Sequence, residues 1–145
     1  MLTLLRISNF ALIERLELEP GPGLTVLTGE TGAGKSIILA AVNLLLGQRA
    51  AVDLIRAGAD QAVVEALFRL PADSPPMQRL AGEGQAPEPG EDLLLRRVVS
   101  REGRNRVQAG GGLATLALLA ELGPELLSLV GQHASQALLR PEEHL

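Results

Sequence analysis

The residues of this chain best suited to chemistry lie between Gly29 and Ser36 and read GETGAGKS. They fit the phosphate-loop pattern G-x-x-x-x-G-K-[ST], in which glycines let backbone N–H groups turn inward around an anion. A helix that opens at about Lys35 directs its positive dipole end at the same anion. Lys35 is therefore expected to reach the β- and γ-phosphates of ATP, and the Ser36 hydroxyl is expected to bind Mg²⁺. The residues predicted to contact the nucleotide are Gly29, Glu30, Thr31, Gly32, Ala33, Gly34, Lys35, Ser36 and Ile37.

The sequence on both sides of the loop predicts the strand and the helix that normally flank a phosphate loop. A short apolar strand is predicted at Leu24–Thr28 and an apolar helix at Ser36–Leu46, with Gly47 as the stop signal of the helix. Lys35 is also the single lysine among 13 basic residues. Two compatible explanations for this single lysine are a composition biased toward arginine and a need for a compact ammonium at this position. The strand–loop–helix order favours a phosphate loop over a glycine turn that only imitates the pattern.

Hydrolysis of ATP needs a second acidic residue for Mg²⁺ and a group that orients the attacking water. No apolar strand of this chain ends convincingly in such an acid. Ala62 to Glu65 comes nearest, but this segment is more typical of an edge strand with a solvated glutamate. Leu126 to Val130 has the apolar run and leads instead into Gly131 and Gln132. The Gln132 amide offers a donor and an acceptor, so it could coordinate Mg²⁺ and hold a water, or it could simply cap a loop.

Periodicity predicts a mixed α/β domain in which antiparallel strands accompany the phosphate loop and its helix. Further strands are predicted at Met1–Ser8, Ala11–Glu19, Ala62–Leu70 and Leu126–Val130, and a hairpin at Leu93–Ser100 and Arg104–Ala109. A helix at Leu113–Leu122 is expected to be broken by Gly123-Pro124. Residues 71–92 are expected to form an exposed, mobile loop because they are rich in proline, glycine and acids. A last helix is expected to begin at about Pro141 and, at Leu145, to be too short to stand alone, so that the chain looks cut off.

Composition excludes several classes of function. Apolar residues make up 46% of the 145 residues and cysteine is absent, so a core can form while disulfides, thiolate metal sites and thiol nucleophiles are excluded. No apolar run reaches the roughly 18 residues of a membrane span, and the first residues show no secretory signal. The sequence therefore predicts a soluble cytoplasmic protein without a membrane partner. The net charge of −4 argues against a wholly basic nucleic-acid binder.

Motifs along nearly the whole chain resemble one family of ATPases. Besides the phosphate loop they are L-x-x-L-x-I-S-N-F-A at 2–11, LGQRA at 46–50, LIRAGA at 54–59, LLLRRVVSREGRNR at 93–106 and GQHASQALLRPEEH at 131–144. In this order they resemble the N-terminal lobe of the SMC-like ATPase heads and, within that group, of the RecN family of bacterial DNA-repair proteins. Ala11 and the last motif favour RecN, because SMC proteins and RecF usually carry a basic residue where Ala11 stands.

This resemblance accounts for the missing acid. It implies a split P-loop head of ABC/SMC type, in which a C-terminal lobe of the same protein returns after a long coiled coil with the signature motif and the acidic strand. Two heads pair as a homodimer around two ATP molecules, and DNA is a further partner, which implies a nucleoid-associated protein. Gln132 becomes the glutamine-loop residue, with a catalytic role beside Lys35 and Ser36, and Arg56 is expected to reach the nucleotide phosphates. Residues 1–145 alone are then expected to bind ATP without turning it over.

A local basic patch is predicted on and beside the hairpin, where it could contact DNA phosphates. Its members are Arg96, Arg97, Arg101, Arg104 and Arg106. A solvated hairpin face paired with nearby glutamates is the simpler alternative, and strand alternation prevents Arg96 and Arg97 from sharing one face.

Two other classes of function remain open at this point. One is a self-contained P-loop kinase, which would need a catalytic acid and a substrate lid within this chain. The other is a transporter-type ATP-binding subunit, for which Phe10 is the only aromatic candidate to stack on adenine.

Overall fold

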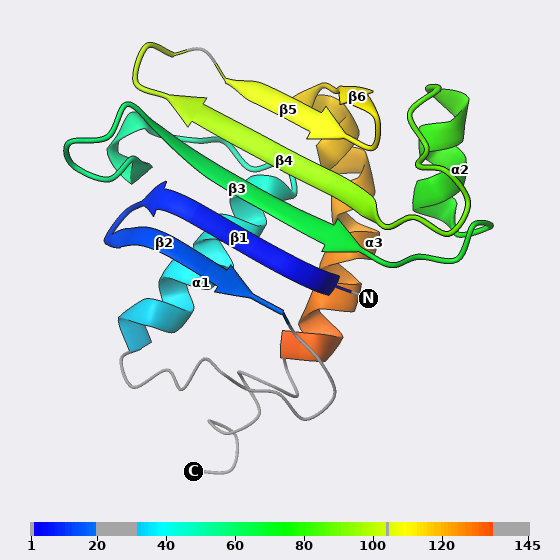
Figure 1. The fold of residues 1–145 in the computed structure, drawn as a ribbon, viewed down its shortest axis with the longest axis horizontal. Helices are drawn as coiled ribbons and strands as arrows, with labels where there is room; N and C mark the ends of the chain where they lie inside the picture. The colour runs from blue at the N-terminus through cyan, green and yellow to red at the C-terminus, as the bar shows by residue number, and fades with distance from the viewer. Residues whose placement is uncertain (1, 20–31, 104, 135–145) are drawn as a thin grey trace, which may run out of the picture.

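The computed structural model describes residues 2–19, 32–103 and 105–134, and for residues 32–35 and 127–134 it describes the backbone only. One six-stranded sheet runs across the molecule, with helices α1 and α3 behind it and the short helix α2 at one end (Figure 1). The strand predicted at Leu24–Thr28 and the helix predicted to begin at Pro141 lie outside the described residues.

The sheet is antiparallel throughout and has the order β2-β1-β3-β4-β5-β6. Its strands are β1 (Leu2–Phe10), β2 (Ile13–Leu18), β3 (Gln61–Phe68), β4 (Leu93–Ser100), β5 (Arg106–Ala109) and β6 (Gly112–Leu113). These bounds confirm the two N-terminal strands, the strand near Ala62 and the hairpin that were predicted from alternation. The short strand β6 was not predicted.

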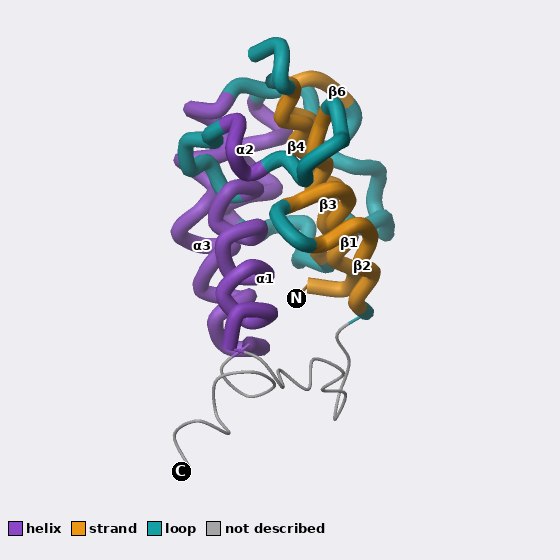
Figure 2. Tube along the Cα trace, turned by 90° about the vertical axis from the view of Figure 1, so that its left-hand side faces the viewer, coloured by secondary structure: helices purple, strands orange, loops and turns teal. Residues whose placement is uncertain are grey.

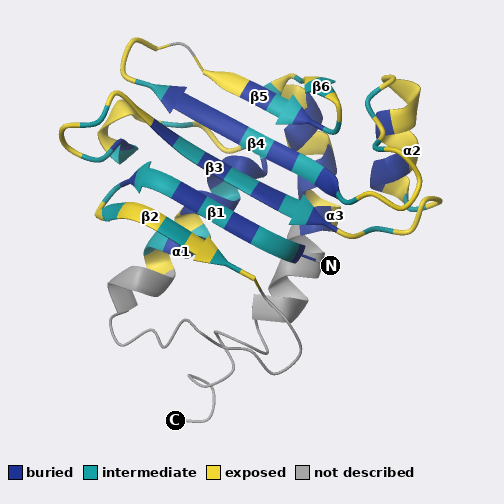
Figure 3. Ribbon diagram, viewed as in Figure 1, coloured by how far each residue is buried: buried dark blue, intermediate teal, exposed yellow. Residues whose placement is uncertain are grey.

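Alternation along the strands gives the sheet one apolar and one more polar face. On β3, for example, Ala62, Val64, Ala66 and Phe68 are buried, while the residues between them are more exposed. Helices α1 (Gly32–Leu45) and α3 (Leu116–Ala134) lie on the apolar side, and among the described elements no helix covers the opposite side (Figure 2). The buried residues of the central strands and the two helices form one core between these layers (Figure 3).

Helix α1 covers the predicted segment and ends at a glycine stop, but it begins at Gly32, earlier than the predicted start near Lys35. Ile38, Ala41, Val42 and Leu45 are buried, because the sequence after Ser36 is almost wholly apolar. The N–H groups of Gly47 and Gln48 donate to the carbonyls of Leu44 and Asn43 at 3.3 and 3.2 Å. This pair of bonds defines a Schellman motif, and the φ of 109° at Gly47 is one that glycine adopts without steric cost. A short 3₁₀ turn, η1 (Val52–Leu54), follows.

Helix α3 corrects the prediction of a broken helix followed by a strand at 126–130. A single helix runs from Leu116 to Ala134, with Pro124 inside it. Leu118, Leu119, Leu122 and Leu126 are buried at helical spacing, and their burial against the sheet outweighs the hydrogen bond that Pro124 cannot make. The apolar run at 126–130 therefore belongs to a helix, which periodicity alone does not distinguish from a strand.

Helix α2 (Pro75–Gly82) corrects the prediction that residues 71–92 form an exposed loop throughout. Two prolines begin it, and proline is well suited to a first helical turn. Met77 and Leu80 are buried at helical spacing. The side chain of Arg79 ties this helix to α3 through Glu121, with 2.7 Å between Nε and Oε2. The composition of residues 71–92, which is rich in proline, glycine and acids, did not indicate this helix.

Charged side chains form a row across the face of the sheet that the helices leave open. Arg6 on β1 bonds Glu17 on β2 and Glu65 on β3, at 2.9 and 3.1 Å, and Arg96 on β4 lies 3.3 Å from Glu65. Glu65 was predicted to be a solvated residue on an edge strand. That prediction was wrong, because β3 is an interior strand and Glu65 is held between two arginines.

Candidate nucleotide site

Of the predicted phosphate-loop residues, those from Gly32 to Ile37 lie at the N-terminal end of α1. The backbone of Gly32 to Lys35 already belongs to the helix, and Ser36 in its second turn is exposed while Ile37 is half-buried. Gly29, Glu30 and Thr31 lie outside the described residues, as does the side chain of Lys35. The first turn of α1 carries no acidic residue. No carboxylate of the helix itself therefore competes with an anion for the free N–H groups and positive dipole at this end, which fits a phosphate ligand.

The opposite end of α1 is held by a buried arginine. Arg97 on β4 is 1% exposed, and its Nη1 donates to the carbonyl oxygens of Leu44 and Gln48, on either side of the glycine turn. Burial lowers the pKa of this guanidinium from its ordinary value. The last turn of α1 has no basic residue of its own. Arg97 therefore supplies, from the sheet, the cation that a helix C-terminus favours.

Helix α3 crosses α1 at the same end, and the contact is close enough to require glycine. A Cβ on Gly47 would lie 2.8 Å from the backbone nitrogen of Ala120, and a Cβ on Gly123 would lie 2.7 Å from the carbonyl oxygen of Leu46. Both distances are shorter than real Cβ contacts allow, and in each case the facing atom is backbone. The two helices are thus locked where α1 ends.

The segment 54–59, which carries Arg56, is held by hydrogen bonds on two sides. On one side, the N–H of Arg56 donates to Asn9 at 2.9 Å and the N–H of Ala11 donates to Leu54 at 2.7 Å, joining the segment to the β1–β2 turn. Asn9 and Ala11 both have positive φ, of 54° and 53°, which for alanine is an uncommon conformation that the surrounding bonds maintain.

On the other side of this segment, Arg101 from the β4–β5 turn donates to three of its carbonyl groups. Its Nε lies 2.6 Å from the oxygen of Ala59, and its Nη2 lies 3.0 Å from that of Arg56 and 3.4 Å from that of Ile55. The side chain of Arg56 is half-exposed and lies 3.8 Å from Glu14, while its Nε is buried without a hydrogen-bond partner. The expected contact of Arg56 with phosphate stays a prediction.

Gln132 was predicted to follow a buried strand, but it belongs to the last turns of α3. Its side chain lies outside what the structure describes. The predicted Mg²⁺ site at Ser36 and Gln132 therefore stays a prediction. Within the described residues, His, Asp and Glu side chains form no cluster that could hold a metal ion.

The five-arginine patch is not one surface. Arg97 is buried and cannot contact DNA, which corrects its place in the predicted patch. The guanidinium of Arg101 donates to backbone carbonyls, and that of Arg96 forms an ion pair with Glu65. Arg106 is exposed on β5, and Arg104 lies outside the described residues. Alternation along β4 separates the arginines, because neighbouring residues of a strand point to opposite faces.

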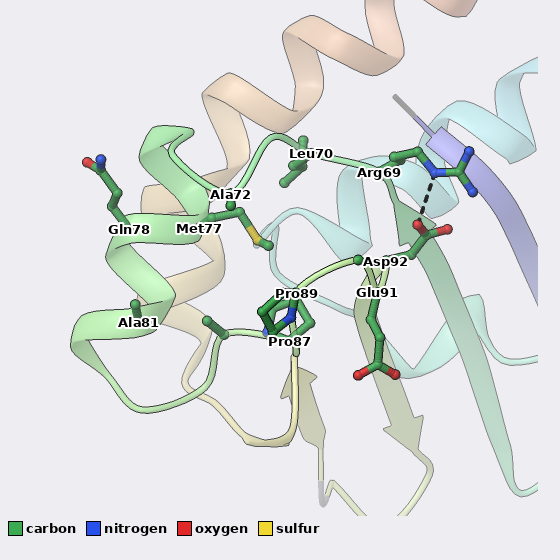
Figure 4. A pocket seen from close by; sticks show the side chains of 12 residues that line it. Arg69, Leu70, Ala72, Met77, Gln78, Ala81, Pro87, Pro89, Glu91 and Asp92 are labelled. Atoms are coloured by element: carbon green, nitrogen blue, oxygen red, sulfur yellow. Dashed lines mark hydrogen bonds and ion pairs between the residues drawn. The ribbon is translucent and has the colours of Figure 1, made fainter.

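A cavity of about 310 Å³ lies beside α2 (Figure 4), and no residue of α1 lines it. Leu70, Met77 and Pro87 are among its mainly apolar lining, and Asp92 at its rim pairs with Arg69 at 3.2 Å. The cavity contributes no group to the nucleotide site. In the part of the chain that the structure describes, no helix is both long and apolar enough to cross a membrane.

Comparison with known proteins shows which class of proteins shares this fold. A model of the AAA domain family matches residues 4–65. An SMC ATPase, from a study of ATP-driven dimerization and DNA-stimulated activation of SMC ATPases, superposes with a TM-score of 0.61 at 24% identity, covering 83% of this chain and 75% of that one. The recombination mediator protein RecF, solved as RecF-ATPrS, gives a TM-score of 0.61 at 18% identity, covering 82% of this chain and 29% of that one. The chain therefore has the fold of these SMC and RecF proteins, as its motifs predicted.

The sequence match is more specific. DNA repair protein RecN of Halalkalibacterium halodurans is 43% identical over 145 residues, which is 100% of this chain and 26% of that protein. All 145 residues of this chain are therefore homologous to part of RecN, and the resemblance drawn from its motifs is confirmed. It spans about a quarter of the length of the curated relatives that it matches.

Sequence reasoning missed the groups that hold α1 in place. Alternation contained a signal for Arg97, because Leu93, Leu95 and Val99 share its face and are buried. Gly123 was read as a helix breaker, although a glycine inside a helix can equally mark a close contact. The role of Arg101 depends on contacts with residues more than 40 positions away, and no local pattern reveals it.

Proposed function

We propose that this chain is the ATP-binding lobe of a RecN-type ATPase that acts in the repair of DNA double-strand breaks and in recombination. The observation that carries the proposal is the GETGAGKS motif, whose last five residues open a buried helix with no acid in its first turn. Homology to RecN over the whole chain supports it.

In this proposal, the residues of the loop and the first turns of α1 bind the triphosphate. Lys35 supplies a positive charge to the β- and γ-phosphates, Ser36 and Gln132 bind Mg²⁺, and Arg56 adds a contact from the segment that Arg101 fixes. Mg²⁺ would neutralise charge that develops on the phosphates. No apolar strand of this sequence ends convincingly in the acid that would complete the site. Hydrolysis would then require a C-terminal lobe of the same protein, which by the resemblance carries the acidic strand, and pairing with a second head.

The partners follow from the same proposal. A homodimer of heads would enclose two ATP molecules, and DNA would be the partner of the assembled, cytoplasmic and nucleoid-associated protein. The SMC neighbour is described as an ATPase with ATP-driven dimerization and DNA-stimulated activation, which supports head pairing by analogy. Arg96, Arg101, Arg104 and Arg106 stay candidates for DNA contact, whereas Arg97 is excluded by its burial.

The test is a paired measurement on the chain of 145 residues. MgATP binding is followed by calorimetry and phosphate release by a coupled assay, each for the native chain and for Lys35→Ala. Saturable binding that is lost in the variant, without turnover, is the expected result. Turnover that depends on Lys35 in this chain alone would contradict the need for a second lobe and would favour a self-contained P-loop enzyme.

A further inference from the structure

The two ends of α1 face different requirements. Its N-terminal end carries the residues proposed to bind phosphate, and its C-terminal end lies in the core between the sheet and α3. A helix of 14 residues is a rod of about 20 Å without an internal joint. Whatever fixes the axial position and rotation of this rod at one end therefore determines where its first turns meet a ligand.

Most contacts that α1 makes in the core do not specify its position closely. Ala41, Val42 and Leu45 are buried in apolar surroundings, and apolar contact is non-directional. The hydrogen bonds from Arg97 are directional. They come from β4, an interior strand, and they end on two carbonyl oxygens that flank the glycine turn, so both sliding and rotation of α1 would break them.

The burial of Arg97 is difficult to explain as simple packing. A guanidinium that is 1% exposed has lost its hydration, and its Nε has no hydrogen-bond partner. An apolar side chain at this position would fill the same core without that cost. The arginine offers what an apolar residue cannot, namely a cation whose Nη1 donates to two carbonyls at the negative end of the helix dipole. The opposite, positive end of the same dipole faces the proposed phosphates.

We propose that Arg97 is a positioning residue of the nucleotide site, which anchors the C-terminal end of α1 to the sheet and thereby sets where Lys35 and Ser36 meet the phosphates. The close contacts of Gly47 with Ala120 and of Gly123 with Leu46 form the second half of this anchor, because they fix the same end of α1 against α3. The inference rests on the proposed ATP binding but concerns a residue that touches no nucleotide.

Arg96→Met is a matched control for Arg97→Met. The two residues are consecutive on β4, so both substitutions remove one arginine from the same strand, but Arg96 lies on the open face and pairs with Glu65. Calorimetry with MgATP is performed on the native chain and both variants at a temperature where circular dichroism shows each to be folded. We expect Arg97→Met to weaken binding by about tenfold or more, because small displacements of binding groups are costly. Arg96→Met should stay within about twofold of the native chain, as expected for an exposed pair.

Arg97→Lys separates positioning from stability. Lysine keeps the charge and a donor but lacks the length and the rigid plane of the guanidinium, so it should recover part of the affinity lost in Arg97→Met. It also serves as the decisive variant if Arg97→Met does not fold. Full native affinity in a folded Arg97→Met chain, or in Arg97→Lys if that is the only folded variant, would show that Arg97 serves stability alone and would overturn the inference.

Hydrogen exchange gives a second readout that needs no nucleotide. In Arg97→Met and Arg97→Lys, exchange should rise in the first turns of α1, residues 33–38, and not only beside the substitution at residues 44–48. A rise confined to residues 44–48 would contradict the inference. If the native chain binds no MgATP, the proposed function fails for this chain, and the exchange pattern still decides whether Arg97 controls the far end of the helix.

Discussion

Arg96 and Arg97 are neighbours in the chain but lie in opposite environments. The side chain of Arg96 is 37% exposed and shares Glu65 with Arg6 on the open face of the sheet, whereas Arg97 is buried between the sheet and the helices and bonds the end of α1. The face that a residue occupies on a strand therefore decides whether its charge is a solvated partner or an internal anchor. A count of arginines along the hairpin does not measure a surface for nucleic acid.

The substitution Gly47→Val should produce the largest effect, because it disrupts the buried region in two ways. The φ of 109° is strained for valine, and a Cβ would lie 2.8 Å from the backbone of Ala120. Strain and overpacking together should lower the free energy of unfolding by about 3–5 kcal/mol, measured by urea denaturation.

Gly58→Val is the control for this prediction. Gly58 also has a positive φ, of 90°, but nothing lies within 4 Å of its Cβ position. It should therefore show the backbone strain alone, about 1–2 kcal/mol. Equal losses in the two variants would mean that the close approach of α3 to α1 has no energetic weight.

Arg97→Met should have the next largest effect on stability. The carbonyls of Leu44 and Gln48 would lose a donor in the core, and we expect a loss of about 2–3 kcal/mol in the free energy of unfolding. Arg96→Met, on the open face, should cost less than about 1 kcal/mol because exposed ion pairs contribute little. Similar losses in both variants would remove the distinction between the two faces.

Arg101→Ala should have a smaller and local effect. The guanidinium of Arg101 is exposed, and it holds the carbonyls of Ala59, Arg56 and Ile55. Its removal should cost about 1 kcal/mol of global stability. Exchange at the amides of residues 55–60 should increase much more than exchange on β3. Unchanged exchange in this segment would show that the β1–β2 turn alone is sufficient to hold it.

Local patterns could predict strands β1 to β5 and the first helix, and they did so for physical reasons. β1, β3 and β4 alternate because one face of the sheet is buried, and α1 is apolar because it packs in the core. Gly47 was readable as a helix stop because the Schellman turn requires a positive φ.

Tertiary contacts decided what the sequence did not reveal. Gly123 and Pro124 resemble a helix break, but the backbone of Leu46 lies opposite Gly123, and Leu126 beyond them continues the buried stripe of α3. Residues 75–82 have the composition of a loop, yet Met77 and Leu80 are buried at helical spacing. Of the candidate site, the sequence indicated the residues that are proposed to bind phosphate, but it did not reveal Arg97 and Arg101, because they bond carbonyls more than 40 residues away.

The most direct test of the whole account is hydrogen exchange of the native chain with and without saturating MgATP. The account predicts protection in residues 29–38, where the loop and the first turns of α1 would bind the phosphates, together with little change on the open face of the sheet. Protection confined to the cavity beside α2, or no protection in residues 29–38, would contradict the claim that α1 carries an anchored nucleotide site.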